Sequence, residues 1–361
     1  MFNFRLFSNS YSYYTICITY KVKFNQKCTC TEDKLLLIFN AYAYFGQTGT
    51  KDRNGYIKVI IYNSKKHHYL NAVKATSKYF PECKNQESKA LKTAKWIVRD
   101  SKNDVYVLSV KIYNKRAIII RGTLGTKNFV KLFMKLSSTT MKGISGRILN
   151  YAAKKEKSLG SRIKSFLAKN KEKKLILSGH SQGGGNVYAL AAHLFSNTKS
   201  QLGKKFRGNV RIVNFGAIAA GDEKFDRSFC NKIKGRNYIT TAVVSKERIY
   251  DSSYVFNKVA CKGSLSKKKY KICIPEQVKY CRRNYKQISL TTSLSKSKTN
   301  WAKKAKSYQK AVCKSKNIFQ KLVKFALCKS AKASKFVTKA LAGWEIHQLS
   351  KFAQGLAKHI C

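Results

Sequence analysis

Short apolar runs alternate with longer segments of mixed polarity along most of this chain. The runs are rich in Val, Ile and Leu, which is typical of strands buried on both faces of a sheet. Such strands are expected at residues 105–112, 116–120, 175–178, 210–215 and 238–244. The segments between most of them are long enough for the helical crossovers that parallel strands require. The pattern predicts an α/β fold with a mostly parallel central sheet flanked by helices.

The predicted strand at residues 175–178 is followed by a turn with the sequence of a catalytic site. Residues 179–183 read Gly-His-Ser-Gln-Gly, and Asn186 to Phe195 is typical of a buried helix. A serine between a strand and a helix has a strained backbone and projects from the sheet edge, where it can attack a carbonyl. The helix N-terminus would direct N–H groups toward a developing oxyanion. The pattern indicates Ser181 as a nucleophile, and a glycine-rich turn with an incidental serine is the alternative.

A second strand end offers candidates for the oxyanion hole. Arg121-Gly122-Thr123 follows the run at residues 116–120. An α/β-hydrolase uses one N–H from the residue after the nucleophile and another from a loop after an upstream strand. Gln182 and Thr123 occupy those two positions. Taken alone, Arg-Gly-Thr is also an ordinary turn at the end of a strand.

Together these segments resemble the class 3, or fungal-type, lipase family. That family has Arg-Gly-Thr/Ser after an apolar strand, then a lid, then Gly-His-Ser-Leu-Gly-Gly. Residues 210–216 and 221–225 are similar to the family's Thr-Phe-Gly-x-Pro-x-x-Gly-Asp-x-x-Phe, and residues 346–352 are similar to its His-x-x-x-Tyr-Phe. The resemblance covers about residues 41–255 and 344–352. It implies an α/β-hydrolase fold, a lid near the apolar stripe at residues 129–136, and hydrolysis of lipid esters.

The resemblance also implies a base and an acid. The chain order of hydrolase triads is Ser, acid, His, and His347 fits it, although a histidine at the edge of the core is the alternative. In the family, the catalytic aspartate lies at the end of the strand that precedes an Arg-Leu pair. When Arg248-Ile249 is matched to that pair, the position of the aspartate falls on Val244, and a valine cannot orient an imidazole. Glu247 and Asp251 are the nearest carboxylates, with Glu247 slightly favoured, and ordinary loop acids are the alternative for both.

The net charge of the chain indicates what kind of surface the protein binds. Lys and Arg number 74 against 16 acids, so the formal net charge is +58. A field of this strength binds polyanions whatever the fold. An anionic membrane or lipid surface is the expected partner, with non-specific polyanion binding in addition. No module for sequence-specific nucleic-acid recognition is found.

The basic surplus is greatest between Cys261 and Ala340, where Glu276 is the only acid. An apolar stripe from Trp301 to Ala326 recurs there at helical spacing among lysines. We therefore expect a Lys- and Cys-rich helical insertion at about residues 261–340. It is either an interfacial helix lying on anionic lipid or a helix that covers the sheet.

The expected organisation is an N-terminal extension, residues 1–40, followed by one hydrolase domain, residues 41–361, which includes the insertion. Eleven cysteines without metal-ligand spacing suggest disulfides in an oxidising compartment, and hence a secreted or extracellular protein. Residues 1–20 make no convincing signal peptide, and nothing approaches a transmembrane length. We expect no cofactor and no metal.

Two functional hypotheses follow. The first is a serine carboxylic-ester hydrolase of the class 3 lipase type, which cleaves triacylglycerol or phospholipid at an interface. The second is a catalytically impaired lipase-like protein that binds polyanions or anionic membranes. The displaced acid and the extreme charge motivate the second.

Overall fold

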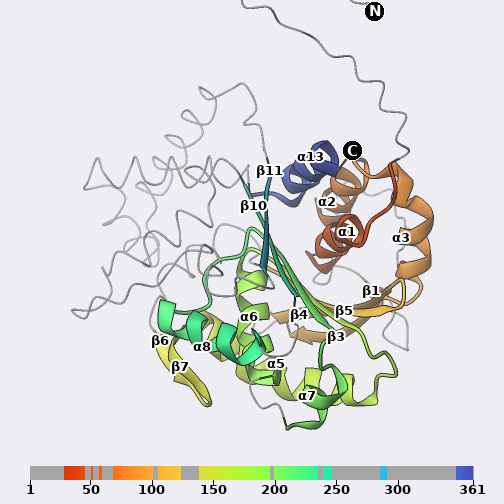
Figure 1. The fold of residues 1–361 in the computed structure, drawn as a ribbon. Helices are drawn as coiled ribbons and strands as arrows, with labels where there is room; N and C mark the ends of the chain where they lie inside the picture. The colour runs from red at the N-terminus through yellow and green to blue at the C-terminus, as the bar shows by residue number, and fades with distance from the viewer. Residues whose placement is uncertain are drawn as a thin grey trace, which may run out of the picture.

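The computed structural model describes residues 28–44, 50–51, 57–58, 68–100, 105–122, 138–195, 199–234, 239–245, 285–290 and 347–360. Figure 1 shows a central sheet with helices packed on both faces. The described helices are α1 Glu32–Tyr44, α2 His68–Ser77, the 3-10 turn η2 Pro81–Cys83, α3 Lys84–Leu91, α5 Asn150–Lys169, α6 Gln182–Phe195, α7 Gln201–Lys205, α8 Glu223–Lys234 and α13 Leu349–Ile360. The described strands are β1 Thr50–Lys51, β2 Ile57–Lys58, β3 Lys95–Asp100, β4 Val105–Ile112, β5 Lys115–Ile120, β6 Ser138–Met141, β7 Ile144–Leu149, β8 Leu175–His180, β9 Val210–Phe215, β10 Ile239–Ser245 and β11 Tyr285–Leu290.

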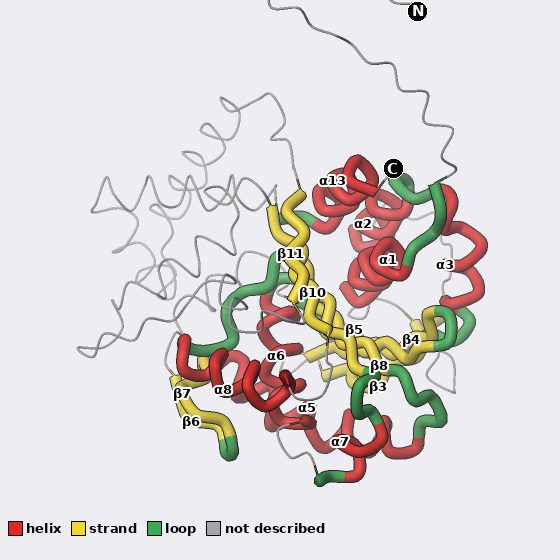
Figure 2. Tube along the Cα trace, viewed as in Figure 1, coloured by secondary structure: helices red, strands yellow, loops and turns green. Residues whose placement is uncertain are grey.

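The central sheet has seven strands in the order β11-β10-β9-β8-β5-β4-β3. Figure 2 shows its strands in yellow between the two groups of helices. Strands β5, β8, β9, β10 and β11 run parallel, and β3 and β4 join them through antiparallel pairs. The predicted mostly parallel sheet is therefore confirmed. Within this sheet, the two strands that the pattern did not predict, β3 and β11, are the edge strands, and both carry polar or charged residues that mask a strand signal.

The central strands are continuously apolar because both faces of the sheet are covered. On one face, Ile118 and Leu177 pack with the helices α5, α6, α7 and α8. On the other, Ile119 and Ile176 pack with α1, α2 and α13. Successive side chains of a strand point to opposite faces, so each layer receives alternate residues. This arrangement explains why apolar runs, and not alternating patterns, marked the strands.

Helix α1 lies at the centre of the second layer, and its residues from Lys34 to Ala43 are buried. Inside that layer, the Asn40 side-chain amide donates to Ser178 Oγ on β8 at 2.8 Å. The boundary expected at residue 40 falls within this helix, so residues 32–40 pack as part of the core. The division of the chain into domains remains a prediction.

Acidic residues attach α1 to the sheet. Glu32 and Asp33, in its first turn, pair with Arg211 on β9, where the Asp33 contact is 2.7 Å, and Glu32 also pairs with Lys115 on β5. Burial lowers the pKa of Arg211, but the carboxylates of Asp33 and Glu32 outweigh it and raise the pKa overall. These contacts fix the first turn of α1 at the N-terminal ends of β5 and β9.

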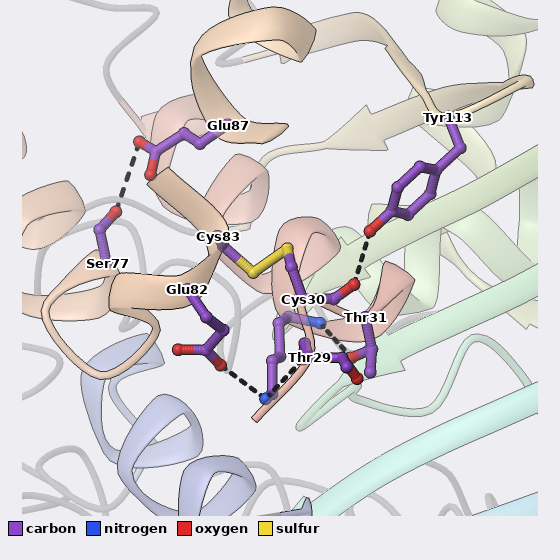
Figure 3. The surroundings of a disulfide bond; sticks show 9 residues. Thr29, Cys30, Thr31, Ser77, Glu82, Cys83, Glu87 and Tyr113 are labelled. Carbon is purple, nitrogen blue, oxygen red and sulfur yellow. Dashed lines mark hydrogen bonds and ion pairs between the residues drawn. A yellow bond between two sulfur atoms is a disulfide. The ribbon is translucent and has the colours of Figure 1, made fainter. Parts of the chain in front are cut away.

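A disulfide between Cys30 and Cys83 joins the segment before α1 to the end of η2 (Figure 3). Cys28 and Cys230 each take part in a disulfide as well. Beside the Cys30–Cys83 bond, the Lys34 ammonium is fully buried and contacts Glu82 Oε1 at 2.6 Å and the Thr29 carbonyl at 3.0 Å. Disulfides were expected from the cysteine content, and these residues confirm that part of the prediction.

The helical insertion expected at about residues 261–340 is not confirmed. The part of it that the structure describes, residues 285–290, is the edge strand β11. The stripe from Trp301 to Ala326 and the lid stripe at residues 129–136 lie outside the described residues. None of the described helices combines the length and the apolar character needed to cross a bilayer.

The Lys34–Glu82 pair gives a test of how α1 is held. Glu82→Ala leaves a buried ammonium without its carboxylate, so we expect a loss of about 3–5 kcal/mol in the free energy of unfolding. Lys34→Met should lower the free energy of unfolding by less, because the Glu82 carboxylate that loses its partner has 18% of its side-chain surface exposed and can be solvated by water. The double variant Lys34→Met/Glu82→Ala should recover most of the loss. Urea unfolding measures all three, and strictly additive losses would contradict the pairing.

Candidate active site

Ser181 lies on the turn between β8 and α6, and its backbone has a φ of 57°. This is the left-handed region, which residues with a Cβ rarely adopt. The turn is held by main-chain hydrogen bonds: Ser181 N–H donates to the Phe215 carbonyl at 3.0 Å, and the Ser181 carbonyl accepts from Gly184 at 3.1 Å and Ile218 at 3.2 Å. The strained serine predicted from the motif is therefore present at the C-terminal end of β8.

Two glycines permit the close approach of backbones around Ser181. A Cβ on Gly183 would lie 2.1 Å from the Ile120 carbonyl oxygen, so α6 can pack against β5 only with glycine there. A Cβ on Gly122 would lie 2.4 Å from the His180 carbonyl and 3.2 Å from Ser181 Cβ. The Arg121-Gly122 segment after β5 is thus adjacent to the serine turn, as an oxyanion loop would be.

His347 lies just before α13 and is buried, with 2% of its surface exposed. A Cβ on Gly216, the residue after β9, would lie 2.8 Å from its Cε1 atom. Gly216 follows Phe215, whose carbonyl accepts the Ser181 N–H. The structure therefore places His347 and Ser181 at the same edge of the sheet, over the C-terminal ends of the neighbouring strands β8 and β9.

The His180 ring joins α1 to the segment that carries His347. Its Nδ1 atom is 2.7 Å from the Tyr44 hydroxyl, and its Nε2 atom is 2.7 Å from the His347 main-chain carbonyl. The His180 and His347 ring centroids are 4.7 Å apart, and the Phe352 ring packs edge-on against both. In the sequence, His180 is part of the Gly-His-Ser-Gln-Gly motif and has no assigned role. Tyr44 carried no motif and was not identified there.

The remaining predicted site residues divide into two groups. Gln182 is the first residue of α6 and is buried, so its N–H group lies at the helix N-terminus directly after Ser181. Thr123, Glu247 and Asp251 lie outside the described residues. Just before Thr123, the Arg121 guanidinium lies 3.9 Å above the Tyr106 ring, a cation–π contact that fixes the start of the loop.

Another acid from the family pattern has a structural use. Asp222 accepts a hydrogen bond from the Phe225 N–H at 2.8 Å and so caps the N-terminus of α8, as short acidic side chains commonly do. Within the ranges that the structure describes, no group of three His, Cys, Asp or Glu side chains could hold a metal ion.

The chain is similar to known proteins over part of its length. Residues 117–246 match the family model of class 3 lipases, as the motifs predicted. Similar solved structures include a propeptide complex of Rhizomucor miehei lipase (14% identity, 60% of each chain, TM-score 0.39) and lipase II from Rhizopus niveus (14% identity, 61% of this chain and 74% of that one, TM-score 0.38). A triacylglycerol lipase from Penicillium expansum is similar at 13% identity, over 62% of this chain and 78% of that one, with a TM-score of 0.38.

None of the curated proteins compared with the chain matches it in sequence. The chain spans 60% of the length of the Rhizomucor miehei chain that it matches. The family match, with a mixed sheet covered by helices on both faces, identifies the fold as that of the α/β-hydrolases, as predicted.

The strain at residue 181 can be measured without any substrate. Ser181→Gly removes the Cβ that disfavours a φ of 57°, whereas Ser181→Ala keeps it. We therefore expect the glycine variant to be more stable than the alanine variant by about 1 kcal/mol. Denaturant unfolding of the two variants provides the comparison. At an ordinary helical φ the order would be reversed, since glycine is then the less stable residue.

Proposed function

We propose, on the premise that residues 117–246 carry the class 3 lipase pattern, that this protein is a serine hydrolase of lipid carboxylic esters acting at an interface. One observation carries the proposal. Ser181 has the left-handed backbone of a nucleophile turn, and the buried His347 lies at the same edge of the sheet. A nucleophile and a base brought together from distant parts of the chain are the minimal equipment for acyl transfer.

In the proposed reaction, Ser181 Oγ attacks the ester carbonyl while His347 accepts its proton. The tetrahedral oxyanion is stabilised by the N–H groups of Gln182 and Thr123. His347 then protonates the departing alcohol, and an acyl ester remains on Ser181. A water molecule, deprotonated by His347, releases the fatty acid. Glu247 or Asp251 would orient His347 and stabilise its charged form.

The described basic residues suggest where an anionic surface is bound. Exposed cationic side chains gather at the C-terminal end of α5, in the loop that follows it, and at α7, and we call this set the basic end: Lys164, Lys169, Lys171, Lys173, Lys174, Lys204 and Arg207. The Leu175 N–H donates to the Asn209 carbonyl, which joins the loops that enter β8 and β9. The basic end therefore lies at the opposite end of β8 from Ser181.

Two contacts near the basic end hold its backbone in place. Lys205 donates to the Leu167 carbonyl at 2.8 Å and so caps the C-terminus of α5. Glu172, the acid within this stretch, is paired with Arg116 at 2.6 Å. The neighbouring lysines then present a positive field to solvent. This arrangement supports attachment to phospholipid headgroups. Hydrolysis of phospholipid or triacylglycerol would take place separately, at Ser181. The Cys30–Cys83 disulfide supports an extracellular location.

A second candidate function is binding without efficient catalysis. The valine at the family's acid position, Val244, and the distance of the basic end from Ser181 favour it. Loss of the acid alone lowers the rate of a serine triad by about 10⁴-fold. In this alternative, the fold holds a polyanion or anionic membrane and Ser181 is not reactive.

Esterase activity separates the two candidates. Ser181→Ala should lower kcat/KM for nitrophenyl esters by at least about 10³-fold, because the nucleophile is lost while the oxyanion donors remain. Hydrolysis of short- and long-chain esters is measured for both proteins, with circular dichroism to check the fold. Equal rates would exclude the mechanism. A fluorophosphonate probe should label the wild type and not the variant, and an unlabelled wild type that still binds heparin would favour the second candidate.

Binding to lipid should depend on the basic end and on salt. Replacing Lys169, Lys171 and Lys173 with Gln should weaken co-sedimentation with phosphatidylserine vesicles by at least tenfold, since each lysine near an anionic surface contributes about 1 kcal/mol. The matched control replaces three exposed lysines at α3: Lys84 and Lys89 within the helix, and Lys92 directly after it. Binding should fall as salt rises. Equal losses in the two triple variants would show that only the net charge matters.

A further inference from the structure

We infer that His180, held by Tyr44, is a positioning residue that fixes the main chain of His347 relative to Ser181. The inference rests on the proposed function, because it assigns His347 as the base. His180 touches neither substrate nor reacting atoms in this scheme. It acts through the residue that does.

The hydrogen bonds of His180 fix the tautomer of its neutral ring. The main-chain carbonyl of His347 can only accept, so the Nε2 atom at 2.7 Å must carry a proton. In a neutral imidazole the other nitrogen then accepts, and the Tyr44 hydroxyl at 2.7 Å must donate to Nδ1. The three groups form a single directed chain from Tyr44 through His180 to the carbonyl of His347.

Packing adds to these two bonds. The faces of the His180 and His347 rings are tilted by 32°, with centroids 4.7 Å apart, and Phe352 from α13 contacts both. His180 is 6% exposed and His347 is 2% exposed. A hydrogen bond shielded from water in this way is stronger than one at the surface. His180 therefore restrains both the backbone and the ring plane of His347.

The contact between His180 and His347 matters for the reaction because His180 directly precedes Ser181 in the chain. His180 is joined covalently to Ser181, so a bond from its side chain to His347 sets the separation of nucleophile and base. A misplacement of about 1 Å between reacting groups can cost about 10²-fold in rate. Tyr44 is the last residue of α1, which is attached to the sheet through Glu32 and Asp33. The restraint on His347 thus extends to α1, whose residues 34–43 are buried.

Kinetics of paired variants test the role. His180→Phe keeps a ring of similar size but removes both hydrogen bonds, and it should lower kcat for a soluble ester by about 10²-fold with little change in KM. His180→Gln retains an N–H group that can reach the His347 carbonyl and should recover part of that loss. Tyr44→Phe should lower kcat less, because the bond to His347 survives.

The matched control is Tyr42→Phe on the same helix. It also removes a tyrosine hydroxyl, one that donates to Glu87 at 2.9 Å on the α3 side, and it should leave kcat unchanged. Thermal unfolding of all variants identifies general loss of structure, which would lower the rates of the Tyr42 and Tyr44 variants alike. Wild-type kcat in a folded His180→Phe protein would overturn the inference.

A spectroscopic measurement separates this inference from the proposed function. The imidazole ¹⁵N signals that disappear in His180→Phe should show a protonated Nε2 and an unprotonated Nδ1 at neutral pH. An unprotonated Nε2, with the proton on Nδ1 instead, would overturn the inference whether or not the protein hydrolyses esters, because the His347 carbonyl would then receive no hydrogen bond. The expected tautomer in a wild type that neither hydrolyses esters nor reacts with a fluorophosphonate would instead refute the proposed function, and with it the catalytic consequence of the contact.

Discussion

The left-handed backbone at Ser181 is the constraint on which the site depends. A residue with a Cβ at this φ costs on the order of 1–3 kcal/mol, and it persists only where the surroundings enforce it. Here the Phe215 carbonyl at the end of β9 accepts a hydrogen bond from the Ser181 N–H. The Ser181 carbonyl accepts from the N–H groups of Gly184 in α6 and of Ile218 in the loop after β9. Gly183 allows α6 to come close enough for this to happen. The serine hydroxyl is therefore presented by the packing of three elements together, and by no single segment.

A second feature is the way in which a very basic chain uses its few acids. Self-repulsion at a net charge of +58 opposes the compact state. Two of the acids, Glu32 and Asp33, lie in the first turn of α1 and pair with Arg211 on the sheet. Two others, Glu82 and Glu87, bond to Lys34 and Tyr42 of the same helix. Burial, followed by the nearby Glu87 charge, raises the pKa of Tyr42, so the Tyr42–Glu87 bond keeps its donor at all ordinary pH values. The acids thus stabilise the helix that ends at Tyr44, next to the candidate site.

The sequence predicted the interior of the sheet well and its borders poorly. Strands β4 and β9 have the predicted bounds, because both faces are buried and the runs stay apolar from end to end. The edge strands β3 and β11 were not predicted, since charged and polar side chains interrupt their apolar positions. Helix α1 gave no helical signal in the sequence for a different reason. It is apolar on nearly all sides and shows no periodic stripe that distinguishes a packed helix from any other apolar segment.

The sequence by itself determined what is local: the buried strands, the glycine-flanked turn at Ser181, the family likeness and the excess of positive charge. Each of these leaves a spacing or a composition that can be read along the chain. Only the tertiary structure decided that His347 lies at the same edge of the sheet as Ser181. The same is true of the hydrogen bonds from His180 to the His347 carbonyl and from Tyr44 to His180. The physical reason is that hydrogen bonds between distant segments depend on how layers pack, and such contacts impose no periodicity on the residues that make them.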